Sequence, residues 1–308
     1  MSTVVLEQPR LVPSPAASVR QLGVIEAKRY ATHPLFVVGA LMCAGLSIGL
    51  PGPDELDYAV IPAFFLGVLG LVVSARLTRS TDTSAPVLDA APVPITRRTA
   101  ALCLACAVPA VAALLIALLH RATLLADPIA DFRYGTFGGL DRQVLTLVLP
   151  VVYAAGGPLL GVVVGRWLRF PGAPLLTVVA LLAWSATLAY LPQSGSSSSA
   201  LLRLLHVSAP YTAFAFSDGD NVHPITVVTT MPGAPLWFAV WAVALCGLAV
   251  CAALWRGASA TVRTSVARAG LVLVAVAAIA LALAATTGHD VNHETDSSGR
   301  TTVVRGDA

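Results

Sequence analysis

The sequence predicts an all-α, polytopic membrane protein with about seven transmembrane helices and a cytoplasmic N-terminus. Of its 308 residues, 56% are hydrophobic and only 11% are charged, whereas soluble proteins carry about 25% charged residues. The 19 basic and 16 acidic side chains give a net charge of +3, which is too balanced and too sparse for a nucleic-acid-binding protein, since such a protein shows a basic patch or stripe. The composition therefore argues against a soluble enzyme and against a nucleic-acid-binding protein.

The single lysine, Lys28, argues against an ATPase. A Walker A loop needs Gly-x-x-x-x-Gly-Lys followed by Ser or Thr, whereas Lys28 follows the sequence VIEA. We therefore expect that this chain is not an enzyme, that it holds no cofactor, and that any ATP hydrolysis takes place in a separate subunit.

Apolar segments long enough, or nearly long enough, to cross a bilayer give the number of spans, since a spanning helix takes about 20 residues. They cover residues 34–50, 58–75, 99–119, 144–165, 173–191, 236–255 and 269–287. No Asp, Glu, Lys, Arg or His lies within them, and Arg166, just after the fourth, is expected to reach the membrane interface. Because ion-coupled transporters commonly keep charged groups inside the membrane, the energy for any transport is expected to come from another protein.

The basic residues predict the orientation. With the N-terminus in the cytoplasm, most of the 19 basic residues fall in cytoplasmic segments, as the positive-inside rule requires. Seven spans then place the C-terminal tail outside. A six-span version would bring that tail inside, and its acidic residues argue against this.

The chain divides into six segments. Residues 1–17 form a flexible Pro-rich tail, 18–33 an amphipathic helix, 34–191 helices 1 to 5 with a cytoplasmic loop at 76–98, 192–235 an extracellular or re-entrant insert, 236–287 helices 6 and 7, and 288–308 a polar tail. The helix at 18–33 is expected to lie in the membrane interface, with a solvated helix as the alternative. The loop at 76–98 is either a docking surface or an ordinary linker.

Three glycines in the fourth span, Gly157, Gly161 and Gly165, predict a helix-packing seam. Glycine at every fourth position leaves one helix face bare, so that a second helix can approach closely. That second helix could belong to a dimer partner or a moving gate, or simply to the same chain. Pro150 and Pro158 in this span predict a kink.

Other patterns give only weak indications of chemistry. All five cysteines lie in apolar spans, so no disulfide framework is expected, and Cys103 and Cys106 are interpreted as small core residues. Asp218, Asp220 and Asn221 lack the later ligands of a calcium loop, and His289, His293 and Glu294 are interpreted as part of a solvated tail, although on one helix face they could hold a metal ion. We therefore predict no catalytic residues and no metal site.

Three segments carry a resemblance to a known family. Residues 26–36 (EAKRYATHPLF), 83–102 (TSAPVLDAAPVPITRRTAAL) and 161–172 (GVVVGRWLRFPG) resemble ABC-2-type transporter permeases of high-GC Gram-positive bacteria. They correspond to the family's entry to the first span, its loop between the second and third spans, and its turn after the fourth span. They occur in the family's order, and the resemblance covers most of residues 20–255.

The resemblance implies the membrane half of an ATP-driven exporter in the bacterial cytoplasmic membrane. Two permease subunits, as a homo- or heterodimer, would form an alternating-access pathway surrounded by lipid and bind cytoplasmic ABC ATPase subunits. The helix at 18–32 would be the interfacial connecting helix, and the insert at 192–235 would hold re-entrant helices. The coupling contact with the ATPase would fall in the loop at 76–98, with Val87, Leu88, Asp89, Pro92 and Pro94 as its candidate residues.

The chain departs from the family in one respect. The family core has six spans with both ends in the cytoplasm, whereas this sequence predicts a seventh at 269–287. A structural or regulatory membrane protein with no transport activity is the alternative, and a membrane-embedded enzyme is a more distant one. An apolar pathway without charges fits many substrates, so the sequence names none.

Overall fold

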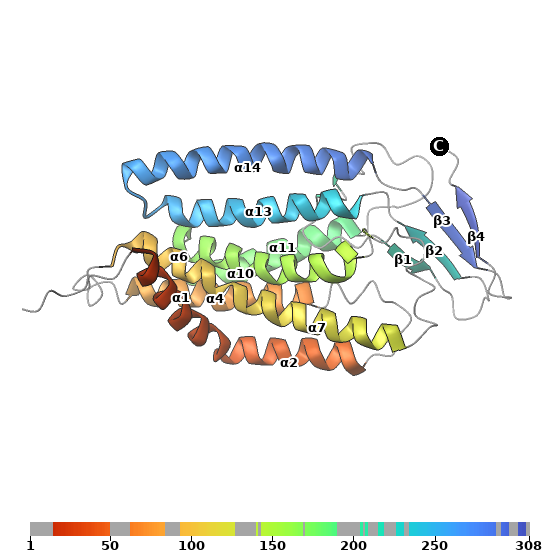
Figure 1. Cartoon of the computed structure of the whole chain (residues 1–308), viewed down its shortest axis with the longest axis horizontal. Helices are drawn as coiled ribbons and strands as arrows, with labels where there is room; N and C mark the ends of the chain where they lie inside the picture. Colours follow the sequence, from red (N-terminus) through yellow and green to blue (C-terminus); the bar gives the residue numbers. More distant parts are fainter. Residues whose placement is uncertain are drawn as a thin grey trace, which may run out of the picture.

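The computed structural model is a bundle of antiparallel helices (Figure 1). It describes residues 15–49, 62–83, 93–126, 140, 143–168, 170–189, 204–205, 207–208, 215–218, 226–230, 234–287, 291–295 and 301–305. Its helices are α1 (Pro15–Ala31), α2 (Pro34–Gly49), η1 (Ala63–Val68), α4 (Leu69–Thr83), α6 (Ile95–Ala105), α7 (Ala107–Ala126), η2 (Val144–Val148), α10 (Leu149–Trp167), α11 (Ala173–Ala189), α13 (Pro235–Trp255) and α14 (Ala260–Thr286). The π-helical turns η1 and η2 run directly into α4 and α10.

The two ends of the bundle differ. At the end where α1 lies, α4, α10 and α13 finish and α6, α11 and α14 start; we call it the α1 end. The opposite end carries the short strands of a sheet (Figure 1), and we call it the sheet end.

Several helices are suited to a membrane. Among the described residues, four helices are long and apolar enough to cross one, namely Ile95–Leu119, Val144–Trp167, Pro235–Trp255 and Ala260–Thr286, and a fifth is obtained if the bent pair Val19–Ala31 and Pro34–Ser47 counts as one span. Ala173–Thr187 is a shorter apolar helix. Residues 63–75 of the expected segment at 58–75 lie in η1 and α4, and residues 58–61 lie outside the described residues. The chain is thus a helical, multi-pass membrane protein, and the number seven remains a prediction.

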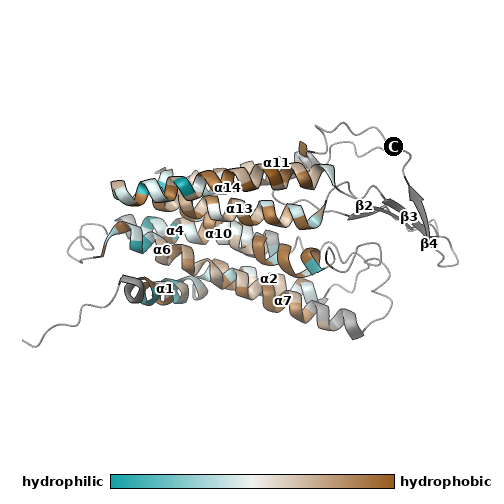
Figure 2. Cartoon of the chain, turned by 45° about the horizontal axis from the view of Figure 1, so that its top comes forward, coloured by the Kyte–Doolittle hydropathy of each residue, from teal (hydrophilic) through white to brown (hydrophobic). Residues whose placement is uncertain are grey.

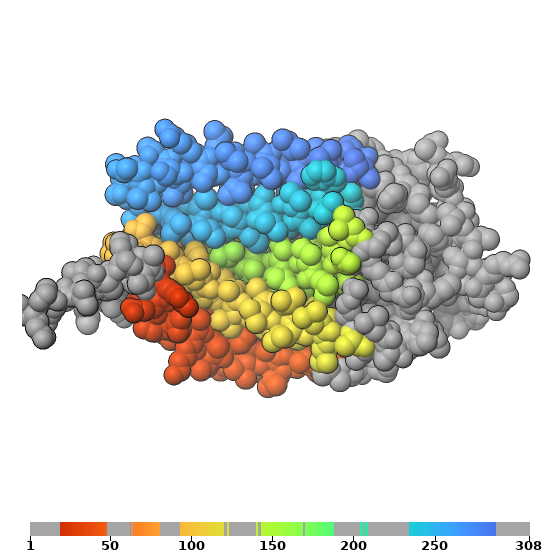
Figure 3. Space-filling model, viewed as in Figure 1, coloured from red at the N-terminus to blue at the C-terminus, as the bar shows by residue number. Residues whose placement is uncertain are grey.

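The outward faces of the helices are apolar, as a lipid-facing surface requires. Leu41, Leu115, Leu175 and Leu271 are each more than 60% exposed. Figure 2 shows hydrophobic residues along the lengths of the helices, and Figure 3 shows α2, α7, α10, α13 and α14 side by side on one face.

A bend of 66° separates α1 from α2. His33 produces a well-formed start for α2: its carbonyl accepts the amides of Phe36 and Val37, and its Nδ1 accepts the amide of Leu35 at 3.3 Å. Pro34 follows at the first helical position, where proline is favoured. The helix expected at 18–33 begins earlier than predicted, at Pro15, so the tail expected at 1–17 is shorter; residues 1–14 lie outside the described residues.

A small four-stranded antiparallel sheet adds to the helical bundle at the sheet end. Its order is β1 (Ala215–Asp218), β2 (Thr226–Thr230), β3 (Val291–Thr295) and β4 (Thr301–Arg305). Val228 pairs with His293, which in turn pairs with Val303, so the insert at 192–235 and the tail at 288–308 are joined at one end of the bundle. The strands β2 and β4 consist mostly of Thr and Val, whose branched side chains favour extended backbone. Re-entrant helices were expected in the insert; among its described residues, 204–205 and 207 are helical, and Pro235 begins α13.

The core forms around α10, which contacts η1, α4, α7 and α13. Tyr153 and Phe238 are in edge-to-face contact at a centroid distance of 6.3 Å and belong to a buried cluster shared by η2, α10, α13 and α14. A second cluster, around Tyr30 and Val162, joins α1, α4, α6, α10 and α13. This second cluster lies directly beneath the α1 end.

Candidate functional site

The α1 end of the bundle gathers most of the basic side chains. Those described there are Arg20, Lys28, Arg29, Arg76, Arg79, Arg97, Arg98, Arg166, Arg256, Arg263 and Arg268. Glu26 is the one acidic side chain that the structure describes at this end. The expected loop leaves α4 and returns to α6 here, so this end is the candidate site for a partner.

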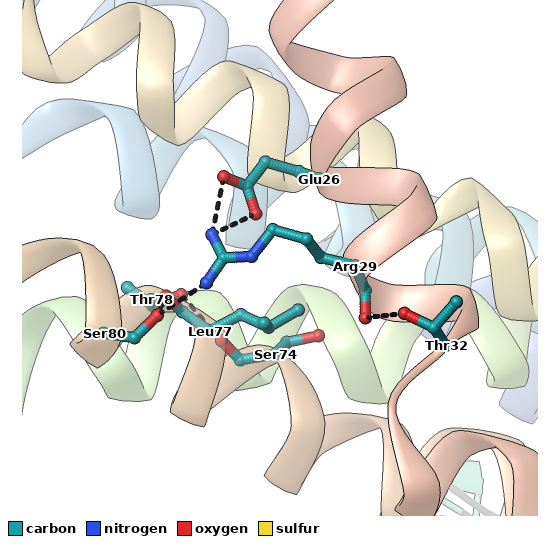
Figure 4. Close-up of polar contacts among 7 residues, drawn as sticks. All are labelled: Glu26, Arg29, Thr32, Ser74, Leu77, Thr78 and Ser80. Carbon is teal, nitrogen blue, oxygen red and sulfur yellow. Dashed lines mark hydrogen bonds and ion pairs between the residues drawn. The ribbon is translucent and has the colours of Figure 1, made fainter.

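Arg29 ties α1 to α4 (Figure 4). Its Nη1 donates to both carboxylate oxygens of Glu26, at 3.0 and 3.1 Å, and its Nη2 donates to Ser80 Oγ at 3.2 Å. Ser80 in turn donates to the carbonyl of Leu77. The contact therefore reaches the last turn of α4, just before residues 84–92.

Tyr30 anchors the same helix in the bundle. Its side chain is only 1% exposed and packs with Val73, Leu77 and Leu102. A methyl group added at Gly70 would lie 2.5 Å from the Tyr30 hydroxyl, so the missing side chain of Gly70 makes room for the ring. The sequence analysis did not single out this contact, because one aromatic residue in an amphipathic helix does not reveal its partner.

Arg79 holds the turn between α10 and α11. Its guanidinium donates to the carbonyls of Leu168, Phe170 and Pro171, with distances of 3.0 Å to Leu168 and 3.1 Å to Pro171. A basic side chain is well placed on carbonyls at a helix C-terminus, where the helix dipole is negative. The end of α4 is thus fixed to the turn that follows α10.

Arg166 corrects the expectation that it reaches the membrane interface. It is only 8% exposed, and its Nη2 donates to Thr99 Oγ1 at 2.6 Å. Thr99 donates to the carbonyl of Ile95 at 3.0 Å. The side chain therefore turns into the bundle and links α10 to the first turns of α6.

Trp167 links α10 to α13. Its Nε1 donates to the carbonyl of Ala252 at 3.0 Å, and the guanidinium carbon of Arg256 lies 5.8 Å from the centroid of its ring. A cation at this distance is attracted by the ring face. Arg256 is thereby held beside Trp167 at the α1 end.

Four of the five candidate coupling residues lie outside the described residues, namely Val87, Leu88, Asp89 and Pro92. Pro94 is exposed and precedes α6, where its carbonyl accepts the amides of Arg97 and Arg98. The structure thus places Thr83 and Pro94, which flank this segment, at the α1 end.

The three glycines of α10 face η1 and α4 of the same chain. A methyl group added at Gly157 would lie 2.1 Å from the carbonyl oxygen of Gly67, and one at Gly161 would lie 2.2 Å from that of Leu71. At Gly165 it would lie 2.7 Å from Thr78 Cβ. Since their own chain occupies this face, it is not open to a helix of a second subunit.

An apolar groove lies between α10, α11 and α13. It is open on one side and has a volume of about 400 Å³. Its lining residues are Val152, Tyr153, Gly156, Gly157, Leu160, Val163, Leu181, Trp241, Ala242, Leu245, Cys246, Leu248, Ala249 and Ala252. The sequence did not predict this groove, because its lining residues come from three helices and are brought together only in the folded protein.

The weaker sequence patterns are not brought together. All five cysteines are free, and Cys106 Sγ donates to the carbonyl of Leu102 at 3.4 Å. Asp218 ends β1, and His293 and Glu294 lie in β3, so they share no helix face; Asp220, Asn221 and His289 lie outside the described residues. Within the described residues, no three or more His, Cys, Asp or Glu are placed to hold a metal ion.

Comparison with family models, with curated proteins and with solved structures finds no match to the chain.

Proposed function

We propose that the chain is the membrane-spanning permease subunit of an ATP-driven, ABC-2-like exporter of the bacterial cytoplasmic membrane, working as a dimer with a separate ATPase. The observation that carries the proposal is the set of contacts from the end of α4. Arg29 binds Ser80 there, and Arg79 binds the turn after α10. A force on the 84–92 segment would therefore act at once on α1, α4 and α10.

The basic side chains support a cytoplasmic location for the α1 end. Eleven basic side chains and one acidic side chain are described there, and the positive-inside rule assigns such an end to the cytoplasm. A cytoplasmic ATPase would then face the segment between α4 and α6. The sheet end would lie outside.

The packing supports a rigid-body mechanism. Close backbone contact along Gly157, Gly161 and Gly165 makes α4 and α10 one unit, and rigid elements are what transmit a displacement between distant sites. Closure of the ATPase would tilt this unit against α13 and α14 and alternately open the pathway to each side. The chain itself would hydrolyse nothing.

Co-purification with the ATPase tests the proposal. The tagged protein is isolated gently from its native membrane, in its natural form and with residues 89–94 (DAAPVP) scrambled. The control scrambles residues 127–132 (DPIADF), a segment of the same length and similar composition after α7. An ATPase that accompanies the natural and control proteins but not the 89–94 variant is the expected result. A folded, intact chain recovered without any ATPase would instead favour a structural or regulatory membrane protein.

A further inference from the structure

The groove between α10, α11 and α13 has the chemistry of a site for a hydrocarbon chain. Apart from the Tyr153 hydroxyl, the Trp241 indole and the Cys246 thiol, the side chains that line it carry no polar atom. A peptide in this groove would leave its backbone amides and carbonyls without partners, which is costly away from water. An acyl chain has no such groups.

The dimensions of the groove match one leaflet of a bilayer. Along α13 it extends from Trp241 to Ala252, a length of about 16 Å at about 1.5 Å per residue. This is about half the hydrocarbon thickness of a bilayer, which is about 30 Å. Ala252 lies at the α1 end of the groove, so the leaflet concerned is the one on that side.

A positive charge stands where the groove meets the α1 end. Ala252 lines the groove, its carbonyl accepts the indole N–H of Trp167, and Arg256 lies over the ring of that tryptophan. No carboxylate within the described part of the chain lies within ion-pair distance of Arg256. Tryptophan and arginine together favour the level of the lipid headgroups.

We propose that this groove binds one acyl chain of an anionic phospholipid from the leaflet at the α1 end, with the phosphate of the headgroup held by Arg256. The acyl chain fills the space between α11 and α13. The phosphate accepts hydrogen bonds from the guanidinium, which is a favourable partner for it. This site is independent of the proposed function, because it needs only that the protein lies in a membrane.

Photolabelling by two matched lipids tests the site. The full chain is placed in phosphatidylcholine nanodiscs with a trace of phosphatidylglycerol or phosphatidylcholine, each carrying the same diazirine in one acyl chain. Labelled peptides are identified by mass spectrometry. The expected labels fall in 152–163 and 241–252, and the anionic probe labels them about fivefold more than the neutral one, as one basic residue at a membrane surface provides. Equal labelling by both probes, or labels spread evenly over the exposed helix faces, would overturn the proposal.

Matched variants separate the roles of headgroup and chain. Arg256→Gln should abolish the preference for the anionic probe, whereas Arg263→Gln, on the exposed start of α14, should retain it. Ala249→Phe should fill the groove and remove its labels from both probes, whereas Ala278→Phe on the exposed face of α14 should not.

Where Ala249→Phe does not yield folded protein, Leu245→Trp fills the same groove from a position that is 38% exposed. Undiminished labelling in the groove-filling variant, or an unchanged lipid preference in Arg256→Gln, would contradict the assignment.

Discussion

Arg166 of α10 donates a hydrogen bond to the hydroxyl of Thr99 of α6 at 2.6 Å, and both side chains are buried. A charged donor makes this a strong contact, because hydrogen bonds to charged groups contribute more than neutral ones. It joins α10 to α6 in the interior of the bundle at the α1 end, whereas the contacts of Arg29 and Arg79 lie nearer the surface.

Thr99→Val should therefore destabilise the protein. Valine has nearly the same shape but cannot accept the hydrogen bond, and we expect the free energy of unfolding to fall by about 1.5–3 kcal/mol. Thermal unfolding in detergent measures the change. Thr177→Val is the control, because the Thr177 hydroxyl donates only to the carbonyl of Ala173 in its own helix. Equal effects of the two substitutions would show that the contact with Arg166 adds nothing.

Gly161→Ala should separate α10 from α4. The added methyl group would meet the carbonyl oxygen of Leu71 at 2.2 Å, and a backbone atom cannot move aside as a flexible side chain can. Overpacking of this kind costs about 1–3 kcal/mol, which exceeds the gain of about 1 kcal/mol from replacing glycine by alanine in a helix.

Gly270→Ala is the matched control for this seam. Gly270 lies inside α14, and beyond its chain neighbours and the adjacent backbone of its own helix no atom lies within 4 Å of the added methyl group, so only the gain in helix propensity remains. We expect thermal unfolding to shift upward for Gly270→Ala and downward for Gly161→Ala. A Gly161→Ala protein as stable as the natural one would disprove the close contact.

His33 should make the bend between α1 and α2 sensitive to pH. It lies between the two helices. Its pKa is lowered from the usual 6.5, mainly by burial and to a smaller extent by the nearby positive charge of Arg76. The folded protein therefore binds a proton less readily than the unfolded chain, and stability should decrease as the pH falls below about 6.5. Protonation would also remove the acceptor that Nδ1 presents to the amide of Leu35.

His33→Asn tests this titration. Asparagine can still cap the helix, so the variant should remain folded but lose this part of the pH dependence. Melting temperatures in detergent between about pH 5 and about pH 8 give the comparison. A natural protein whose stability fell no more steeply than that of the variant below pH 6.5 would refute the role of His33.

The sequence predicted the helices better than the contacts between them. Long apolar runs identify helices such as α13 whatever their neighbours are, and the spacing of Gly157 and Gly161 predicts close packing. The partner of that seam could not be predicted, because Gly67 and Leu71 meet it only after the chain has folded back. The sheet was missed because Thr226–Thr230 and Thr301–Arg305 are short strands, far apart in sequence, within segments that are polar overall. Burial of Arg166 was missed because its acceptor, Thr99, lies in another helix.

Arg79→Gln should release the turn between α10 and α11. The guanidinium donates to three carbonyl oxygens of that turn, those of Leu168, Phe170 and Pro171, and the shorter glutamine cannot reach all of them. Trypsin cuts after arginine, and Arg169 stands between Leu168 and Phe170 in the sequence, so limited proteolysis reports directly on release of the turn. We expect faster cleavage there in Arg79→Gln than in Arg76→Gln, which removes an exposed charge from the same helix. If both variants were cut as slowly as the natural protein, the turn would be held by its own backbone, and the link from α4 to α10 would depend on the glycine seam alone.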